Sequence, residues 1–163
     1  MGAEPMRIDL AKIAPDAYRH FLQLEGVIAR HVDRKLLHLI KLRASQINGC
    51  AFCLAMHTDE ALRDGEPAER LTLLDAWEES TLYSEKERAA LAWAEEVTLI
   101  ADSGASKETF DALKAHFGDE EIGWLTLAAV QINAWNRIAI SSRAQYDRAM
   151  FAAPAPQRTP EPA

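Results

Sequence analysis

The sequence has no long apolar run, no excess of positive charge and very few cysteines. Its 163 residues include 2 Cys, 18 Lys or Arg and 25 Asp or Glu, and the net charge is −7 at pH 7. Nucleic-acid-binding proteins neutralise phosphates with a basic face, so this charge balance argues against a nucleic-acid partner. No stretch approaches the roughly 20 apolar residues that span a bilayer, so we expect no membrane partner either.

A secretory signal and a Gly-rich phosphate loop are also missing. The first residues, "MGAEPMRIDLAKIAP", lack a basic region followed by an apolar stretch, so we expect a cytoplasmic protein. In that reducing compartment, two cysteines separated by two residues are more typical of catalysis or metal binding than of a structural disulfide. Without a Gly-rich phosphate loop, the sequence indicates no organic cofactor.

Strand-like alternation of apolar and polar residues is almost absent, whereas helical spacing recurs along the chain. The length suits one domain with its own core. We therefore predict an all-α, single-domain protein with an N-terminal segment at 1–13, a helical domain at 14–151 and a Pro- and Ala-rich tail at 152–163, whose composition predicts disorder. The predicted helices cover residues 14–29, 33–47, 50–63, 68–77, 84–100, 107–117 and 120–150.

Both cysteines lie in the stretch "SQINGCAFCLAMHTDEA", together with His57. The Asn-Gly pair predicts a helix that begins near Cys50, and helical spacing then puts Cys50, Cys53 and His57 on one face. Free backbone N–H groups in the first turn favour a thiolate at Cys50, and His57 is placed to take or return the proton of Cys53. This grouping predicts a dithiol in which one sulfur becomes a sulfenic acid and the other resolves it to a disulfide.

The stretch "LLHLIKLRASQINGCAFCLAMHTDEA" resembles the core of the AhpD-like alkylhydroperoxidases of the carboxymuconolactone decarboxylase family. The similarity extends to "LLDAWEES", "YSEKERAALAWAEEVT" and "INAWNRIAI", over roughly residues 14–145. It implies an AhpD-like helical bundle, symmetric homo-oligomers, and an antioxidant peroxidase or disulfide reductase that an external thiol reductant regenerates. The resemblance assigns the attack on peroxide to Cys53 and the resolving role to Cys50, with His57 in a proton relay. The helix-terminus argument favours Cys50 as the attacking sulfur, and both assignments remain open.

One position departs from the family's pattern. Where the family has a glutamate of the proton relay, twelve residues before the first cysteine, this chain has His38. A neutral His38 can accept a proton as a general base, whereas a cationic His38 would favour a nearby thiolate through its charge. We therefore include His38 among the catalytic candidates, together with Cys50, Cys53 and His57.

Other interpretations of these residues are a zinc site, two buried structural cysteines, and lactone decarboxylation. Two thiols and two imidazoles, from Cys50, Cys53, His57 and His38, form the ligand set of a structural zinc site. A metal-stabilised or non-catalytic oligomer of the same fold is therefore the main alternative to the enzyme. Buried cysteines without chemistry are common in protein cores.

Other conspicuous residues have structural explanations. We predict that the four tryptophans pack in the core or at an interface, that Trp135 and Asn136 lie near the dithiol, and that Arg43 forms an ion pair between helices. His20, His31 and His116 stand among polar residues, which predicts positions at the surface.

Overall fold

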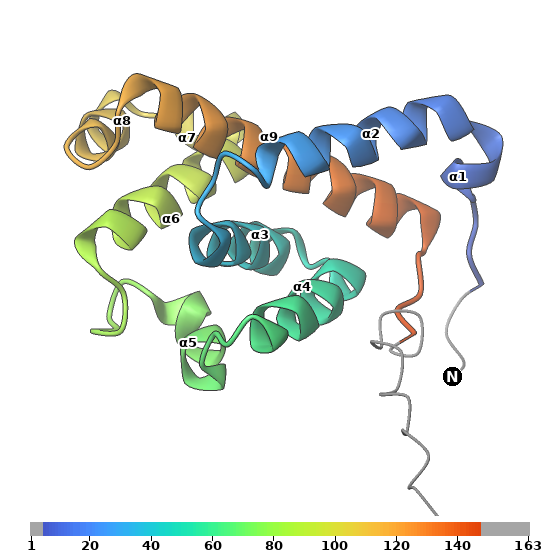
Figure 1. The fold of residues 1–163 in the computed structure, drawn as a ribbon, viewed down its shortest axis with the longest axis horizontal. Coiled ribbons are helices and arrows are strands. Elements are labelled where there is room, and N and C mark those ends of the chain that lie inside the picture. The colour runs from blue at the N-terminus through green and yellow to red at the C-terminus, as the bar shows by residue number, and fades with distance from the viewer. Residues whose placement is uncertain (1–4, 148–163) are drawn as a thin grey trace, which may run out of the picture.

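The computed structural model describes residues 5–147, and within these residues it contains helices and no strand. Figure 1 shows the arrangement. The elements in chain order are α1 (Leu10–Ile13), α2 (Pro15–Ile28), α3 (Arg34–Asn48), α4 (Ala51–Arg63), α5 (Ala68–Leu73), a 3-10 helix (Leu74–Ala76), α6 (Glu85–Thr98), α7 (Ile100–Ser103), α8 (Lys107–Lys114) and α9 (Asp119–Ser142). The predicted all-α, single-domain fold is confirmed, and the tail predicted at 152–163 lies outside the described residues.

Helix α3 is the central element of the fold. It packs against α4, α6 and α9, and α2 lies along α9 (Figure 1). Nine of its residues are buried, and three of them are polar or charged, namely His38, Lys41 and Ser45. A helix that is covered on most sides requires partners for such groups, and neighbouring helices supply them.

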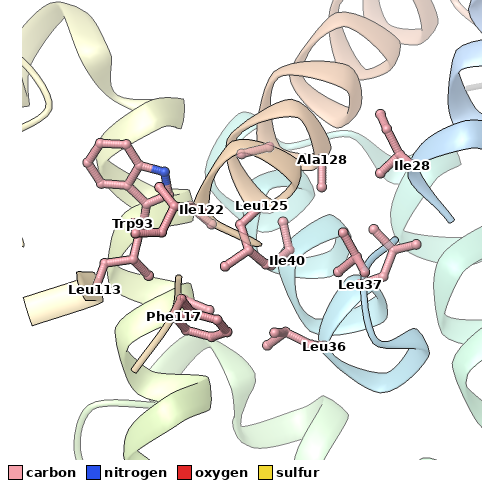
Figure 2. Close-up of a cluster of buried hydrophobic side chains, with 14 residues drawn as sticks. Ile28, Leu36, Leu37, Ile40, Trp93, Leu113, Phe117, Ile122, Leu125 and Ala128 are labelled. Atoms are coloured by element: carbon pink, nitrogen blue, oxygen red, sulfur yellow. The ribbon is translucent and has the colours of Figure 1, made fainter. Parts of the chain in front are cut away.

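The largest hydrophobic core lies between α3, α6, α8 and α9 (Figure 2). Ile40 from α3, Trp93 from α6 and Leu125 from α9 meet there. Fully burying a side chain of this size contributes about 1.5–3 kcal/mol. A separate, smaller cluster contains Cys50 and Cys53, so the dithiol lies outside the main core and between α3, α4 and α9.

Caps explain most of the helix boundaries. Ser84 and Glu87 form the predicted capping box at the start of α6, because the Ser84 side chain accepts the Glu87 N–H and the Glu87 carboxylate accepts the Ser84 N–H. Four predicted helices end too late, at 77, 100, 117 and 150. The first three end instead in a 3-10 turn, at a break at Leu99 and at Lys114.

The fourth prediction, a last helix that reaches residue 150, is wrong because α9 ends at Ser142. Arg143 adopts a left-handed conformation with φ of +57°, and the N–H of Ala144 donates to the carbonyl of Ala139. A helix that ends in this way usually has a glycine at the left-handed position. Because this chain has an arginine there, the sequence does not predict the end of the helix. In the part of the chain that the structure describes, no helix combines the length and apolarity needed to cross a membrane.

Candidate dithiol site

The turn between α3 and α4 sets the position of Cys50. Asn48 ends α3, and Gly49 follows with φ of +68°, a conformation that glycine adopts without a steric penalty. Cys50 is thereby the N-cap of α4, one residue before its first turn. Its Sγ accepts the backbone N–H of Cys53 at 3.4 Å, in the role that a serine or aspartate oxygen has in most caps.

The two sulfurs form a hydrogen-bonded pair. Both cysteines are free thiols, and only 1–2% of their surface is exposed. The hydrogen bond from the Cys53 thiol lowers the pKa of Cys50 to about 7, against the opposing effect of burial and with further help from backbone N–H groups and the Asn136 amide. The same hydrogen bond, together with burial, raises the pKa of Cys53. When the pair loses one proton, the negative charge therefore goes to Cys50 and the remaining proton stays on Cys53.

A network of neutral side chains holds Asn136 in place. Its Nδ2 donates to the Ser45 hydroxyl at 2.9 Å, and its Oδ1 accepts the Asn48 amide at 2.9 Å. The Asn48 amide also donates to Asn133, again at 2.9 Å. Because Asn136 is fully buried and its amide lowers the pKa of Cys50, this network orients a fixed dipole toward the thiolate.

His57 lies one helical turn after Cys53 and is paired with a carboxylate. Its Nδ1 is 2.7 Å from Oε2 of Glu60, and the ring is 4% exposed. Burial would raise the pKa of Glu60, but the hydrogen bond with His57 and the electrostatic effects of His57, Lys41 and His38 outweigh it and lower the pKa. A proton on Nδ1 is thus held by Glu60, which leaves Nε2 as the nitrogen available for proton transfer.

A second buried charge pair lies beside His57. Lys41 of α3 is 9% exposed and forms an ion pair with Glu25 of α2. Both residues line a cavity together with Cys53 and His57. The positive charge of Lys41 also lowers the pKa of Glu60, so it acts on carboxylates of two helices.

His38 has a carboxylate partner of its own. Its Nε2 is 2.6 Å from Oδ2 of Asp64, a carboxylate that also accepts the Arg34 guanidinium at 2.5 Å. His38 does not line the cavities at the cysteines. Among residues 5–147, no group of three or more His, Cys, Asp or Glu side chains is placed to hold a metal ion, so the four candidate zinc ligands are not assembled.

Two neighbouring cavities border the dithiol. The first, which we call the Cys50 cavity, has a volume of about 420 Å³. The second, the Cys53 cavity, has a volume of about 310 Å³. Phe52 and Ala139 line both cavities. Apart from these two residues, the Cys53 cavity is lined by Tyr18, Leu22, Glu25, Lys41, Cys53, Met56, His57, Glu60 and Trp135. The Cys50 cavity is lined by Gly49, Cys50, Ala51, Ala55, Ile140, Arg143, Ala144, Gln145 and Tyr146.

Comparison with known proteins identifies the family. The model of the carboxymuconolactone decarboxylase family matches residues 15–96. The uncharacterized protein YdfG of Bacillus subtilis is 38% identical over 136 residues, which are 83% of this chain and 92% of YdfG. The chain belongs to the carboxymuconolactone decarboxylase family. The AhpD-like resemblance and fold predicted from the sequence are thereby confirmed.

Solved structures extend this assignment of the family. A crystal structure from Agrobacterium tumefaciens, of a protein of unknown function provisionally described as the antioxidant defence protein AhpD, is 45% identical, with a TM-score of 0.85 over 88% of this chain and 99% of that chain. The debrominase Bmp8 is 24% identical, with a TM-score of 0.72 over 85% of this chain and 75% of that chain. At that identity, Bmp8 shows a shared fold alone.

The site of this family member combines residues that the sequence predicted with others that it did not. The structure brings Cys50, Cys53 and His57 together and places Trp135 and Asn136 beside them, as predicted. Three residues were missed, namely Glu25, Lys41 and Glu60. Glu60 had a usable signal, because it lies three residues after His57 on one helix, whereas Glu25 and Lys41 meet only through packing of α2 near α3.

Proposed function

We propose that this protein is a thiol-dependent peroxidase that cycles Cys50 and Cys53 between dithiol and disulfide. The observation that carries the proposal is the placement of two free thiols at the start of one helix, with the Cys50 sulfur as the N-cap that accepts the Cys53 N–H and with a lowered Cys50 pKa. A thiolate is the reactive form of cysteine, and an attacking thiol is most effective when its pKa is near the ambient pH. The 45% identity to a protein described as an antioxidant defence protein supports the same function.

In the oxidative half of the cycle, the Cys50 thiolate attacks the outer oxygen of a hydroperoxide. The O–O bond breaks, Cys50 becomes a sulfenic acid, and the alkoxide leaves and takes a proton from solvent. Cys53 then gives its proton to His57 and attacks the Cys50 sulfur. The S–S bond forms, and the departing hydroxide takes the proton back from His57 and leaves as water. Glu60 stabilises His57 while it carries that proton.

In the reductive half, an external thiolate attacks the Cys53 sulfur of the disulfide. Cys50 leaves as the thiolate, because the leaving sulfur with the lower pKa departs faster. A second external thiolate then attacks the external sulfur of the mixed disulfide, and Cys53 leaves and is reprotonated. A disulfide substrate would be reduced by the same attack of Cys50, so disulfide reductase activity belongs to the same proposal.

Two further parts of the proposal concern the setting of this cycle. Its external thiol reductant requires a reducing compartment, which supports a cytoplasmic location.

Large apolar side chains are exposed on α2 and α9, with Leu24 39%, Leu127 41% and Val130 51% exposed, and these support a homo-oligomer. Light scattering tests the second point, since a homo-oligomer has a multiple of the 18.1 kDa chain mass.

The test of the function is peroxide consumption with a dithiol reductant. Cys50→Ser and Cys53→Ser should each lower turnover by about tenfold or more, since each removes one of the two sulfurs. Equal turnover in both variants and the wild type would contradict the redox cycle and leave the non-catalytic or decarboxylase interpretations. To assign the roles, each variant receives one equivalent of peroxide in the presence of dimedone. Trapping on Cys50 in Cys53→Ser supports the proposal, and trapping on Cys53 alone, in Cys50→Ser, would return the attack to Cys53.

A further inference from the structure

We propose that Asn48 is a positioning residue of the dithiol site, which orients the Asn136 amide so that an N–H group, and not the amide oxygen, faces the Cys50 sulfur. This inference rests on the proposed function and deepens it, because it names the residue that decides how the nucleophile is stabilised. The structural basis is the set of hydrogen bonds that joins α3 to α9 beside the cysteines.

An asparagine side chain can face its neighbours in two ways. Its oxygen accepts hydrogen bonds and its NH2 group donates two, so a half-turn about the last bond exchanges an acceptor for a donor. In Asn136, which is fully buried, Nδ2 faces the Ser45 hydroxyl and Oδ1 faces Asn48. A hydroxyl can donate or accept, so Ser45 satisfies either orientation. Of these two partners, Asn48 is therefore the one that selects the orientation.

The orientation of Asn48 is itself fixed by acceptors. Its Nδ2 lies 2.9 Å from the Ala44 carbonyl, from Oδ1 of Asn133 and from Oδ1 of Asn136. A backbone carbonyl can only accept, so it requires the NH2 end of Asn48 at this place. If Asn136 were reversed, its NH2 group would meet that of Asn48, and two donors would face each other with no acceptor between them.

Asn133 differs from Asn136 because it has other partners of fixed polarity. Its Nδ2 donates to the Ala129 carbonyl and its Oδ1 accepts the Arg137 guanidinium, each at 2.9 Å. A carbonyl only accepts and a guanidinium only donates, so Asn133 keeps its orientation without Asn48. The Asn48 amide has two hydrogens for three acceptors, and Asn133 competes with Asn136 for them. Asn133 is therefore a matched control for Asn48.

The orientation of Asn136 matters because a thiolate only accepts hydrogen bonds. Besides the hydrogen bond from the Cys53 thiol, which has the largest effect, the Asn136 amide lowers the pKa of Cys50 by hydrogen bonding. A reversed amide would turn its oxygen toward the sulfur and oppose the charge. The sulfurs of a disulfide carry no charge, so a donor that stabilises the thiolate also favours the reduced state.

Other titratable and charged groups surround the two cysteines. They lie on α2, α3, α4, α9 and the segment after α9, and they are Glu25, Lys41, Cys53, His57, Asp59, Glu60, Arg137, Arg143 and Tyr146. Asn48→Leu keeps all of these residues and adds no charge. A shift in the titration of Cys50 in this variant therefore reports a change at the amides.

The first test follows the ultraviolet absorbance of the thiolate during a pH titration of the reduced protein. Asn48→Leu removes the donor at nearly constant size, so the pKa of Cys50, about 7 in the wild type, should rise by about one unit. Asn133→Leu removes an amide of the same network and should leave this pKa unchanged. An unchanged pKa in Asn48→Leu, or equal shifts in both variants, would overturn the inference.

A second pair of variants covers the case in which Asn48→Leu does not fold. Asn48→Asp keeps the size of the side chain and offers Asn136 only acceptors, so it should raise the pKa of Cys50 by at least as much. Asn133→Asp adds the same charge to the network without reversing Asn136 and should cause a smaller rise. Equal rises in these two variants would overturn the inference.

The second test asks whether Asn48 acts through Asn136. Asn136→Leu alone should raise the pKa of Cys50, and the addition of Asn48→Leu should cause no further rise, because the amide that Asn48 orients is gone. Shifts that add in the double variant would overturn the inference, since Asn48 would then act on Cys50 without Asn136.

The third test measures the equilibrium between dithiol and disulfide in buffers of reduced and oxidised glutathione. In Asn48→Leu the equilibrium constant for disulfide formation should exceed that of the wild type about twofold at pH 7 and about tenfold at pH 9, where the thiolate predominates in the wild type. A ratio that does not grow with pH would overturn the inference.

These three tests use no peroxide, so they separate the inference from the proposed function. A wild type that consumes no peroxide, together with the expected shifts in Asn48→Leu, would contradict the proposed function and support the inference. Peroxide turnover by the wild type, together with an unshifted Asn48→Leu, would support the function and overturn the inference.

Discussion

The two ends of the dithiol site stabilise charge by different means. At the start of α4, the Cys50 sulfur is surrounded by neutral groups, namely backbone N–H donors, the Cys53 thiol and the Asn136 amide. One turn beyond Cys53, His57 is surrounded by charged groups, with Glu60 as its partner and the pair of Lys41 and Glu25 beside it. Neutral donors stabilise an anion without binding protons themselves, whereas charged pairs respond to pH. The nucleophile and the proton carrier are thus held by groups suited to each role.

Placing a charge at the neutral end should have the largest effect. Asn136→Asp replaces a donor beside Cys50 with a carboxylate, which raises the pKa of Cys50 toward that of a free thiol. In the wild type, the rate of oxidation should rise with pH through about 7 and then level off, because Cys50 loses its proton there. In the variant this midpoint moves to higher pH, and oxidation at pH 7 slows about tenfold or more.

The control for Asn136→Asp is Gln131→Glu, another buried amide on α9, whose Nε2 donates to the Phe21 carbonyl at 3.0 Å. Both variants bury a new carboxylate and should lose stability, but only Asn136→Asp should shift the midpoint of thiolate formation. The thiolate is followed by its ultraviolet absorbance during a pH titration. The same midpoint in both variants would show that Asn136 does not stabilise the thiolate.

Removing the carboxylate of Glu60, at the His57 end of the site, should have an intermediate effect on the reaction rate. Glu60→Gln leaves His57 without its carboxylate, so His57 takes up the proton of Cys53 less readily and formation of the disulfide slows about 3- to 10-fold. The preceding attack by Cys50 on peroxide should not change. Rapid-quench measurement separates the two steps, and Glu69→Gln, an exposed glutamate outside both cavities, is the control. If Glu60→Gln slowed the attack on peroxide, Glu60 would act in that step and the proposed role in disulfide formation would be contradicted.

Glu60 also predicts a pH dependence of stability. The folded protein lowers the pKa of this carboxyl below its usual value of 4.5, so the ionised form stabilises the fold at neutral pH. That contribution is lost as the pH falls from 4.5 through the lowered value. Glu60→Gln should therefore be less stable than the wild type at pH 7, and the difference in Tm should shrink in acid. A difference that grows below pH 4.5 would contradict the assigned pairing.

The smallest effect on activity is expected at His38. His38→Glu restores the family's carboxylate but faces Asp64, so like charges meet at the end of α4 and Tm at pH 7 should fall. Turnover should stay close to that of the wild type, because His38 lines neither cavity. His38→Gln, which can still donate to Asp64, should recover much of the Tm. A large loss of turnover in His38→Gln would place His38 in the catalytic machinery.

The sequence predicted what depends on local spacing and failed where partners come from distant helices. The capping box at Ser84 and the meeting of Cys50, Cys53 and His57 follow from offsets within one segment. The ion pair of Arg43 between helices is also confirmed, since its Nε lies 2.5 Å from the Glu95 carboxylate. His20, His31 and His116 are exposed, as predicted, and His31 stacks on Trp124 with ring centroids 4.0 Å apart.

The failures have physical causes. For His38, which stays a predicted catalytic residue, the sequence did not indicate its partner, because Asp64 at the C-cap of α4 reaches this buried imidazole from a distant part of the chain. Lys41 was absent from the candidates because a lysine in a helix is expected to be exposed to solvent. Its burial becomes evident only when α2 brings Glu25 to it. The early end of α9 depends on the left-handed conformation of Arg143, and an arginine in the sequence does not predict that conformation.

The backbone of Gly49 makes the site intolerant of changes in chain length. Among residues 5–147, and apart from its two chain neighbours, no atom lies within 4 Å of a β-carbon built on this residue, so the positive φ is what requires a glycine here. An insertion of one residue between Gly49 and Cys50 would shift the sequence relative to the start of α4 and rotate every following side chain about 100° around the helix axis. The two thiols would then turn away from the Cys50 cavity and the Cys53 cavity. Relatives that retain this chemistry should therefore vary in loops elsewhere and keep this connection at constant length.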